Sequence, residues 1–299
     1  MTDWFISLEG TPAGAQFALV LAVMAAFLHA LFGALQKQKI DPWTARATID
    51  AGYAILSLPI ALFLVPWPEA ELWPLLGIAW VIHTGYKIAQ ASAYTLGAYT
   101  VVYPVVRGTG PFFTVIGAGI LFGESFAPGQ WAGVAVLVAG IFGLAIYNLA
   151  HIEAGRARLP LALILAVITG CFVALYTTWD AFAIRAAESP FTFLFWFFVI
   201  DGLIFPIGWL VRSRGRLPEP LGAHMRLGLM GAIIAYFSFG AIMLATRLDK
   251  VGEAAVLRET SVVFSALIGW LLLGEKIGPR RLTLFFMIAL GAVMVEALG

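Results

Sequence analysis

The sequence of 299 residues contains few charged residues and one cysteine. Charged residues make up 12% of it and Cys171 is the only cysteine, whereas about 25% of a soluble globular domain is charged. A single thiol excludes a disulfide or a thiolate metal cluster within one chain. The sequence also lacks a Gly-rich phosphate loop, an HExxH zinc motif and a nucleophile elbow, which carry common enzyme chemistries. We therefore expect no enzyme activity, no cofactor and no metal site.

Long apolar runs fill the chain instead. Hydrophobic residues make up 61% of it, and a helix needs about 20 apolar residues to cross a hydrocarbon core of about 30 Å. The short connections between the runs leave no room for a domain that binds nucleic acid. Ten transmembrane helices are predicted over residues 16–37, 43–66, 72–95, 99–122, 128–149, 159–184, 191–211, 223–246, 251–273 and 279–298. The fold class is therefore an all-α, multi-pass membrane protein surrounded by the lipid bilayer.

The second half of the chain repeats the first half at an offset of 151 residues. The aligned pairs include Arg107 and Arg258, Asp50 and Asp201, and Pro128 and Pro279. Because five helices per half is an odd number, the two repeats, residues 1–150 and 151–299, must be inverted relative to each other. Inverted repeats are typical of transporters that expose a site near the membrane midplane to either side in turn.

Most Lys and Arg residues lie in the connections or near the ends of the predicted helices, and these are concentrated on one face. Twelve of them lie on the face opposite the two termini, and three lie on the face of the termini. Since the cytoplasmic face carries the excess of positive charge, both termini are predicted to be non-cytoplasmic in a bacterial inner membrane. The other three cations, Lys87, Arg107 and Arg258, lie inside predicted helices.

The predicted helix 72–95 carries a polar stripe at a spacing of three or four residues. His83 and Lys87 belong to the stripe, and Tyr86 flanks it. Lys87 lies about 10 residues, or about 15 Å, from the end of the helix, and an ionisable group at that depth is typically functional and faces the bundle interior. The alternatives are that Lys87 snorkels to the interface and that His83 is a hydrogen-bonded core residue.

The predicted helix 99–122 carries Tyr99, Tyr103 and Arg107 at intervals of four residues. The depth of Arg107 is similar to that of Lys87, since each lies about 10 residues from the connection between the two helices. Two cations at one depth indicate a receptor for an anionic group of a substrate.

The second half offers further candidates. The recurrence of arginine in both halves favours a role for Arg258 in the scaffold. Glu259 is interpreted as a proton site or an anchor for a substrate ammonium group, or alternatively as a partner of Arg258 or Arg247. Trp179 either contacts the substrate or belongs to the interfacial belt. Because the polar stripe has no counterpart in the second half, we expect the first half to build most of the site.

The sequence LFGE at residues 121–124 recurs as LLGE at residues 272–275, and each turn precedes a helix that begins with proline. Together with the duplicated ten-helix plan, these turns resemble those of the drug/metabolite transporter superfamily. Within it the chain is similar to the EamA-like carriers, specifically the YddG-type exporters of aromatic and other neutral amino acids. The resemblance implies that His83, Tyr86 and Tyr103 line a substrate cavity.

We therefore expect a secondary transporter that exports amino acids, aromatic and other neutral ones, or related small metabolites by alternating access. An amino acid offers a carboxylate for the cations and an apolar side chain for the tyrosines. The alternatives are a nucleotide-sugar or sugar-phosphate exchanger, which calls for a larger cluster of cations, and a broad drug/metabolite exporter. The chain is expected to act as a monomer. The predicted substrate-binding residues are His83, Tyr86, Lys87, Tyr99, Tyr103, Arg107, Trp179 and Glu259.

Overall fold

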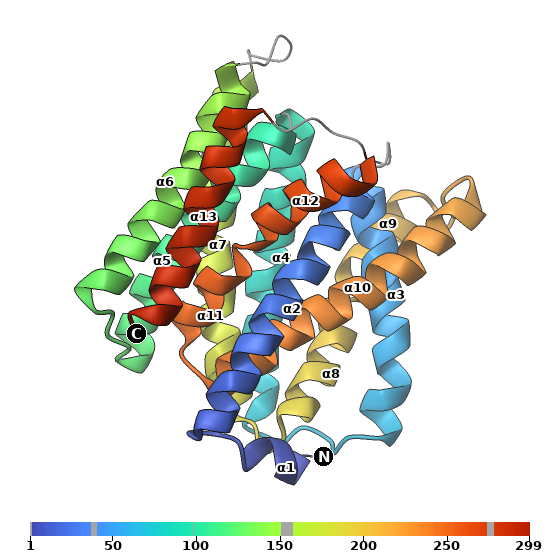
Figure 1. The fold of residues 1–299 in the computed structure, drawn as a ribbon. Coiled ribbons are helices and arrows are strands. Elements are labelled where there is room, and N and C mark those ends of the chain that lie inside the picture. Colours follow the sequence, from blue (N-terminus) through green and yellow to red (C-terminus); the bar gives the residue numbers. More distant parts are fainter. Residues whose placement is uncertain (1, 37–40, 98, 151–157, 274–277) are drawn as a thin grey trace.

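The computed structural model describes residues 2–36, 41–97, 99–150, 158–273 and 278–299, and these residues form helices and no strand. Both termini lie toward the end of the helix bundle where α1 and the start of α2 are found (Figure 1). The helices are α1 (Thr2–Ile6), α2 (Pro12–Gln36), α3 (Pro42–Phe63), α4 (Leu72–Leu96), α5 (Tyr99–Phe122), α6 (Pro128–Ala150), α7 (Leu159–Ala186), α8 (Pro190–Asp201), α9 (Ile204–Arg212), α10 (Leu221–Leu248), α11 (Val251–Arg258), α12 (Ser261–Leu273) and α13 (Pro279–Ala297).

Among the described residues, eight segments are long and apolar enough to cross a membrane. Each of them coincides with one of the predicted helices. The two other predicted helices are α4 and α13, which have 25 and 19 residues. The structure thus agrees with an all-helical membrane protein, whereas ten crossings and an inverted repeat stay predictions.

Two of the predicted helices are each divided into two shorter ones. The segment predicted over 191–211 stops at Asp201 and resumes at Ile204, and the segment predicted over 251–273 stops at Arg258 and resumes at Ser261. The aligned helices of the first half, α3 and α5, are continuous, although α5 contains two internal prolines. Discontinuous helices in transporters typically lie at the substrate or ion site.

The LFGE turn of the first half follows α5 along the chain and is hydrogen-bonded to the start of α11. Gly123 ends α5 with a φ of 67°, a conformation that glycine adopts without a steric penalty. Both carboxylate oxygens of Glu124 then accept backbone N–H groups at the start of α11, from Val251 at 2.7 Å and Gly252 at 2.9 Å. Negative charge is favoured at this end of a helix. Gly274-Glu275, the corresponding turn, lies outside the described residues.

The contacts between the two halves are reciprocal. α2, the first long helix of its half, packs against α10, the third of the other half, and α4 packs against α7 in the same way. α3 packs against α8, α5 against α11, and α6 against α13, which a pseudo-two-fold axis between the halves would also produce. The last pair is very close, because a Cβ atom added to Gly133 would lie 2.8 Å from the carbonyl oxygen of Gly291.

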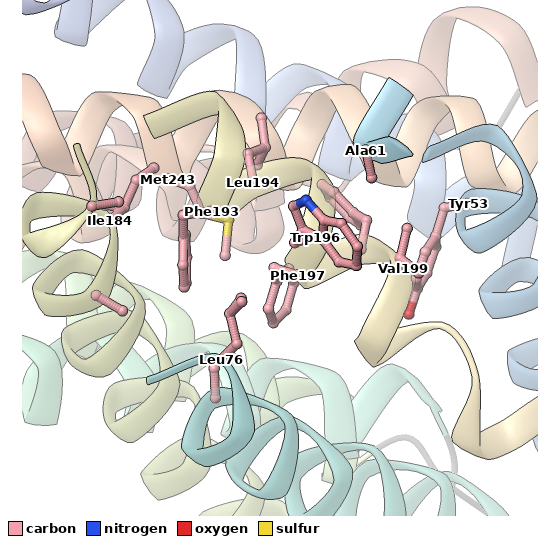
Figure 2. Close-up of a cluster of buried hydrophobic side chains, with 14 of the residues drawn as sticks. Tyr53, Ala61, Leu76, Ile184, Phe193, Leu194, Trp196, Phe197, Val199 and Met243 are labelled. Atoms are coloured by element: carbon pink, nitrogen blue, oxygen red, sulfur yellow. The ribbon is translucent and has the colours of Figure 1, made fainter. Parts of the chain in front are cut away.

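The largest apolar cluster surrounds α8 (Figure 2). Phe193 and Phe197 of α8 are completely buried, and Leu76 of α4, Ile184 of α7 and Met243 of α10 pack in the same cluster. Burying a phenylalanine side chain contributes about 1.5 to 3 kcal/mol. This packing holds α8 between helices of both halves and thereby fixes the position of its last residue.

Candidate functional site

Lys87 is a buried cation that binds both halves of the chain. The residue is 1% exposed, and Nζ donates hydrogen bonds to Oδ2 of Asp50 at 2.7 Å and to Oδ2 of Asp201 at 2.8 Å. A third bond, of 2.8 Å, goes to the hydroxyl of Tyr53. Asp50 and Asp201 are 151 residues apart, the offset at which the sequences of the two halves align, and both carboxylates meet at one lysine.

The same lysine binds the break between α8 and α9. Nζ donates to the carbonyl oxygen of Asp201, the last residue of α8, at 2.9 Å. Next to it, a Cβ atom added to Gly202 would lie 2.7 Å from the carbonyl oxygen of Asp50, so only glycine lets α3 approach this closely. Arg46 forms an ion pair of 2.9 Å with Asp50. We refer to Arg46, Asp50, Tyr53, Lys87 and Asp201 as the lysine cluster, in which two cations balance two carboxylates.

Arg107 repeats this arrangement at the other broken helix. Its Nε atom lies 2.7 Å from Oε2 of Glu259. Nη2 donates to the hydroxyl of Ser261 at 3.0 Å and to the carbonyl oxygen of Arg258, the last residue of α11, at 3.2 Å. At both breaks, therefore, a cation of the first half binds a carboxylate and a backbone carbonyl of the second half.

Arg258 differs from the other two buried cations. It is 4% exposed, and its Nε atom is buried with no hydrogen-bond partner among the residues that the structure describes. Its guanidinium carbon lies 6.0 Å from the centre of the Tyr176 ring. Arg258 occupies the last turn of α11, where the helix dipole favours a positive charge.

Arg258 lines a central cavity of about 80 Å³ between α2, α3, α4, α7, α8, α10 and α11. Seven of its sixteen lining residues are phenylalanine or tyrosine, and such a surface suits an apolar ligand group. His83 is fixed there by a bond of 2.8 Å between Nε2 and Oδ2 of Asp180. The lining is His29, Phe32, Arg46, Ile49, Tyr53, His83, Tyr86, Tyr176, Phe197, Phe198, Asp201, Ala235, Ser238, Phe239, Ile242 and Arg258.

A larger cavity of about 670 Å³ lies between α3, α4 and α9. Its lining includes Trp43 and Thr44 near the start of α3 and Arg212 at the end of α9. Because these residues lie at helix ends, near one face of the bundle, we call this cavity the vestibule. The ring of Phe205, which also lines it, lies 5.6 Å from Nζ of Lys87. Since Tyr53, Asp201 and Arg46 line the central cavity, the lysine cluster lies where the linings of the two cavities meet.

The structure separates the two cations that the sequence places at one depth. Lys87 binds Asp50 and Asp201, Arg107 binds Glu259, and neither cation belongs to the lining of the central cavity. A receptor that uses both of them would require these ion pairs to open.

The predicted aromatic residues also lie in different places. Tyr86 lines the central cavity together with His83, and its ring lies 5.0 Å from that of Tyr176. Tyr103 lies beside Arg107, with 6.0 Å from the guanidinium carbon to the ring centre. The indole N–H of Trp179 donates to the carbonyl oxygen of Leu75. The side chain of Tyr99 lies outside the described residues.

Several residues of the central cavity did not emerge as substrate-binding candidates from the sequence. Tyr176 lines the cavity and Asp180 binds His83 of its lining; the two residues are four apart in one predicted helix, a spacing that places them on one face. Phe239 resembles any apolar residue of a membrane helix, so the sequence carries no signal for it. Arg258 was assigned to the scaffold because of its recurrence.

Comparisons with known proteins agree with this fold. Residues 160–297 match the EamA-like transporter family, which supports the drug/metabolite transporter superfamily and fits a membrane transporter of small molecules rather than an enzyme. No curated protein matches the chain. Among 29 matching chains of solved structures is one described as "Crystal structure of protein", with a TM-score of 0.75 and 17% identity over 94% of this chain and 99% of that chain. At this identity the likeness concerns the fold.

Proposed function

We propose that the chain is a secondary transporter that exports amino acids, aromatic and other neutral ones, or related small metabolites across the bacterial inner membrane. The observation that carries this proposal is the central cavity, where aromatic rings line the wall together with Arg258, a buried cation whose Nε atom has no hydrogen-bond partner among the described residues. The rings suit an apolar side chain, and the cation suits a carboxylate. Because one chain builds the whole cavity, we propose the monomer as the functional unit.

Alternating access is supported by the arrangement of the two halves. Residues 1–150 and 151–299 are proposed as inverted repeats because their sequences align and their helices make reciprocal contacts. The vestibule provides a way toward the central cavity from one face, and the lysine cluster closes it. Rocking of one half against the other would open this closure and close the opposite side.

A nucleotide-sugar or sugar-phosphate exchanger is the competing proposal. A doubly charged phosphate calls for at least two cations that are free to bind it. Arg46, the second arginine of the cavity lining, is already paired with Asp50. One unpaired arginine therefore favours a singly charged carboxylate, although a broad exporter of such metabolites would use the same cavity.

Both termini are proposed to be non-cytoplasmic, because twelve cations lie on the opposite face and three on theirs. Cys171 would be replaced by serine, and a cysteine would then be placed at Ser213 or at Gly299. In intact cells a membrane-impermeant maleimide should label the cysteine at position 299 and spare the one at position 213. The reverse labelling pattern would refute this orientation.

Exchange in proteoliposomes tests the transport function. Vesicles that contain the protein and unlabelled phenylalanine should take up external labelled phenylalanine faster than protein-free vesicles. Vesicles loaded with a sugar phosphate form the second arm, and exchange of sugar phosphate without phenylalanine exchange would favour the competing proposal. Repeating the assay with a pH gradient separates proton-coupled accumulation from passive exchange.

A further inference from the structure

A small extension of the central cavity brings together two charged side chains, each of which has a buried atom without a hydrogen-bond partner among the described residues. Arg258 at the end of α11 and Asp180 of α7 line the same space of about 10 Å³, together with Thr177, Met243 and Thr246. Tyr176, Phe239, Ile242 and Arg258 line both this space and the central cavity. The extension therefore continues the aromatic site toward a polar end.

Asp180 has one carboxylate oxygen available for a ligand. The residue is 2% exposed, and its Oδ2 atom binds His83, but Oδ1 has no hydrogen-bond partner among the described residues. The Nε atom of Arg258 is likewise buried without such a partner. Buried charged groups are costly when they are left unpaired. A ligand that carries an ammonium group and a carboxylate group on the same carbon atom would satisfy both.

We propose that Arg258 binds the α-carboxylate and Asp180 binds the α-ammonium group of a zwitterionic amino acid. The side chain of the amino acid then lies among the rings of Tyr86, Tyr176 and Phe239 in the central cavity. This assignment rests on the proposed transport function and defines its substrate class. It also gives His83 a part, because its bond to Oδ2 orients the Asp180 carboxylate so that Oδ1 faces the ligand.

The cavity must widen to admit such a ligand. Its volume of about 80 Å³ is well below the roughly 300 to 1,000 Å³ of typical small-molecule sites. The structure therefore corresponds to a contracted state of the site. Opening at the lysine cluster would enlarge it from the side of the vestibule.

Direct binding of three ligands to the purified protein, measured by calorimetry, tests the receptor. Phenylalanine carries both charges, phenylalaninamide lacks the carboxylate, and 3-phenylpropanoate lacks the ammonium group. Arg258→Gln should weaken the binding of phenylalanine about tenfold to a hundredfold and change that of phenylalaninamide less than about threefold. Asp180→Asn should weaken phenylalanine similarly and leave 3-phenylpropanoate within about threefold.

Arg107→Gln provides the matched comparison, because Arg107 is the repeat equivalent of Arg258 and is already paired with Glu259. It should change the binding of all three ligands by the same factor. If Arg258→Gln and Asp180→Asn each weakened the binding of all three ligands by the same factor, the proposed zwitterion receptor would be wrong. If Arg107→Gln instead weakened the binding of the two ligands that carry a carboxylate and spared phenylalaninamide, the carboxylate site would be at Arg107.

Should a neutral variant fail to fold, Arg258→Lys and Asp180→Glu keep the charge and alter the geometry. Each should weaken phenylalanine more than the analogue that lacks the group in question, and equal changes would overturn the proposal. If the wild-type protein binds none of the three ligands, the proposed transport function fails as well. If it binds phenylalanine but the variants show no selectivity, only the zwitterion receptor fails.

Discussion

The two halves of the chain build their equivalent helices differently. α3 and α5 are continuous, whereas their counterparts in the second half stop at Asp201 and Arg258 and resume as α9 and α12. At each break the first half supplies the cation, Lys87 or Arg107. The second half supplies a carboxylate and the carbonyl oxygen of the last residue of the helix, which accept hydrogen bonds from that cation or form an ion pair with it. At both breaks the charges that the two halves contribute are therefore complementary.

This difference divides the buried cations into two kinds. Lys87 and Arg107 each bind groups of the other half, so their charges are neutralised and their side chains hold the halves together. Arg258 faces the central cavity without such a partner among the residues described. A cation that is retained in a membrane protein at this cost is typically functional. Stability measurements can therefore test whether the two kinds differ.

Replacing Lys87 should cause the largest loss of stability. Lys87→Met leaves two carboxylates, Asp50 and Asp201, with only Arg46 as a compensating cation. Breaking a buried ion pair from one side typically costs about 3 to 5 kcal/mol. The loss should appear as a lower melting temperature of the detergent-solubilised protein, monitored by intrinsic fluorescence.

Ser238 aligns with Lys87 at the repeat offset and gives a matched control. Its hydroxyl donates one hydrogen bond of 2.9 Å to the carbonyl oxygen of Ala25. Ser238→Ala should therefore cost only about 0.5 to 1.5 kcal/mol. If Lys87→Met were no more destabilising than Ser238→Ala, the lysine cluster would not hold the halves together.

The helices could be predicted well from the sequence, because the length and hydrophobicity of a segment determine whether it can cross a membrane. The breaks at Asp201 and Arg258 could not, since each depends on a cation that is distant in the sequence. Lys87 lies 114 residues from Asp201, and Arg107 lies 151 residues from Arg258. Such partners become visible only when the two halves are packed against each other.

The candidate site was predictable in part for the same reason. His83 and Tyr86 occur within one predicted helix, and the structure places both in the lining of the central cavity. The similar depth of Lys87 and Arg107 in the membrane led to the prediction that both bind an anionic group of the substrate. Depth does not reveal which carboxylate of the protein each cation faces. Recurrence gave Arg258 a role in the scaffold, although recurrence preserves a residue type and not its partner.

The repeat-equivalent arginines allow a second comparison of stability. Arg107→Gln removes the cation that Glu259 faces and weakens the bonds to Ser261 and to the carbonyl oxygen of Arg258. A hydrogen bond to a charged group contributes about 1.5 to 3 kcal/mol. Because the amide of glutamine can still donate hydrogen bonds, whereas methionine cannot, we expect a loss in this range, smaller than that of Lys87→Met.

Arg258→Gln should change stability least, by less than about 1 kcal/mol. The substitution leaves no carboxylate without an existing partner, because Glu259 stays paired with Arg107 and Asp180 stays bonded to His83. It removes the favourable interaction of a cation with the helix end, about 0.3 to 1 kcal/mol, and it also removes the cost of a buried unpaired charge, which offsets that loss. The melting temperatures of the two glutamine variants, measured without ligand, should therefore differ clearly. If Arg258→Gln proved as destabilising as Arg107→Gln, Arg258 would belong to the scaffold and the central cavity would lose its carboxylate receptor.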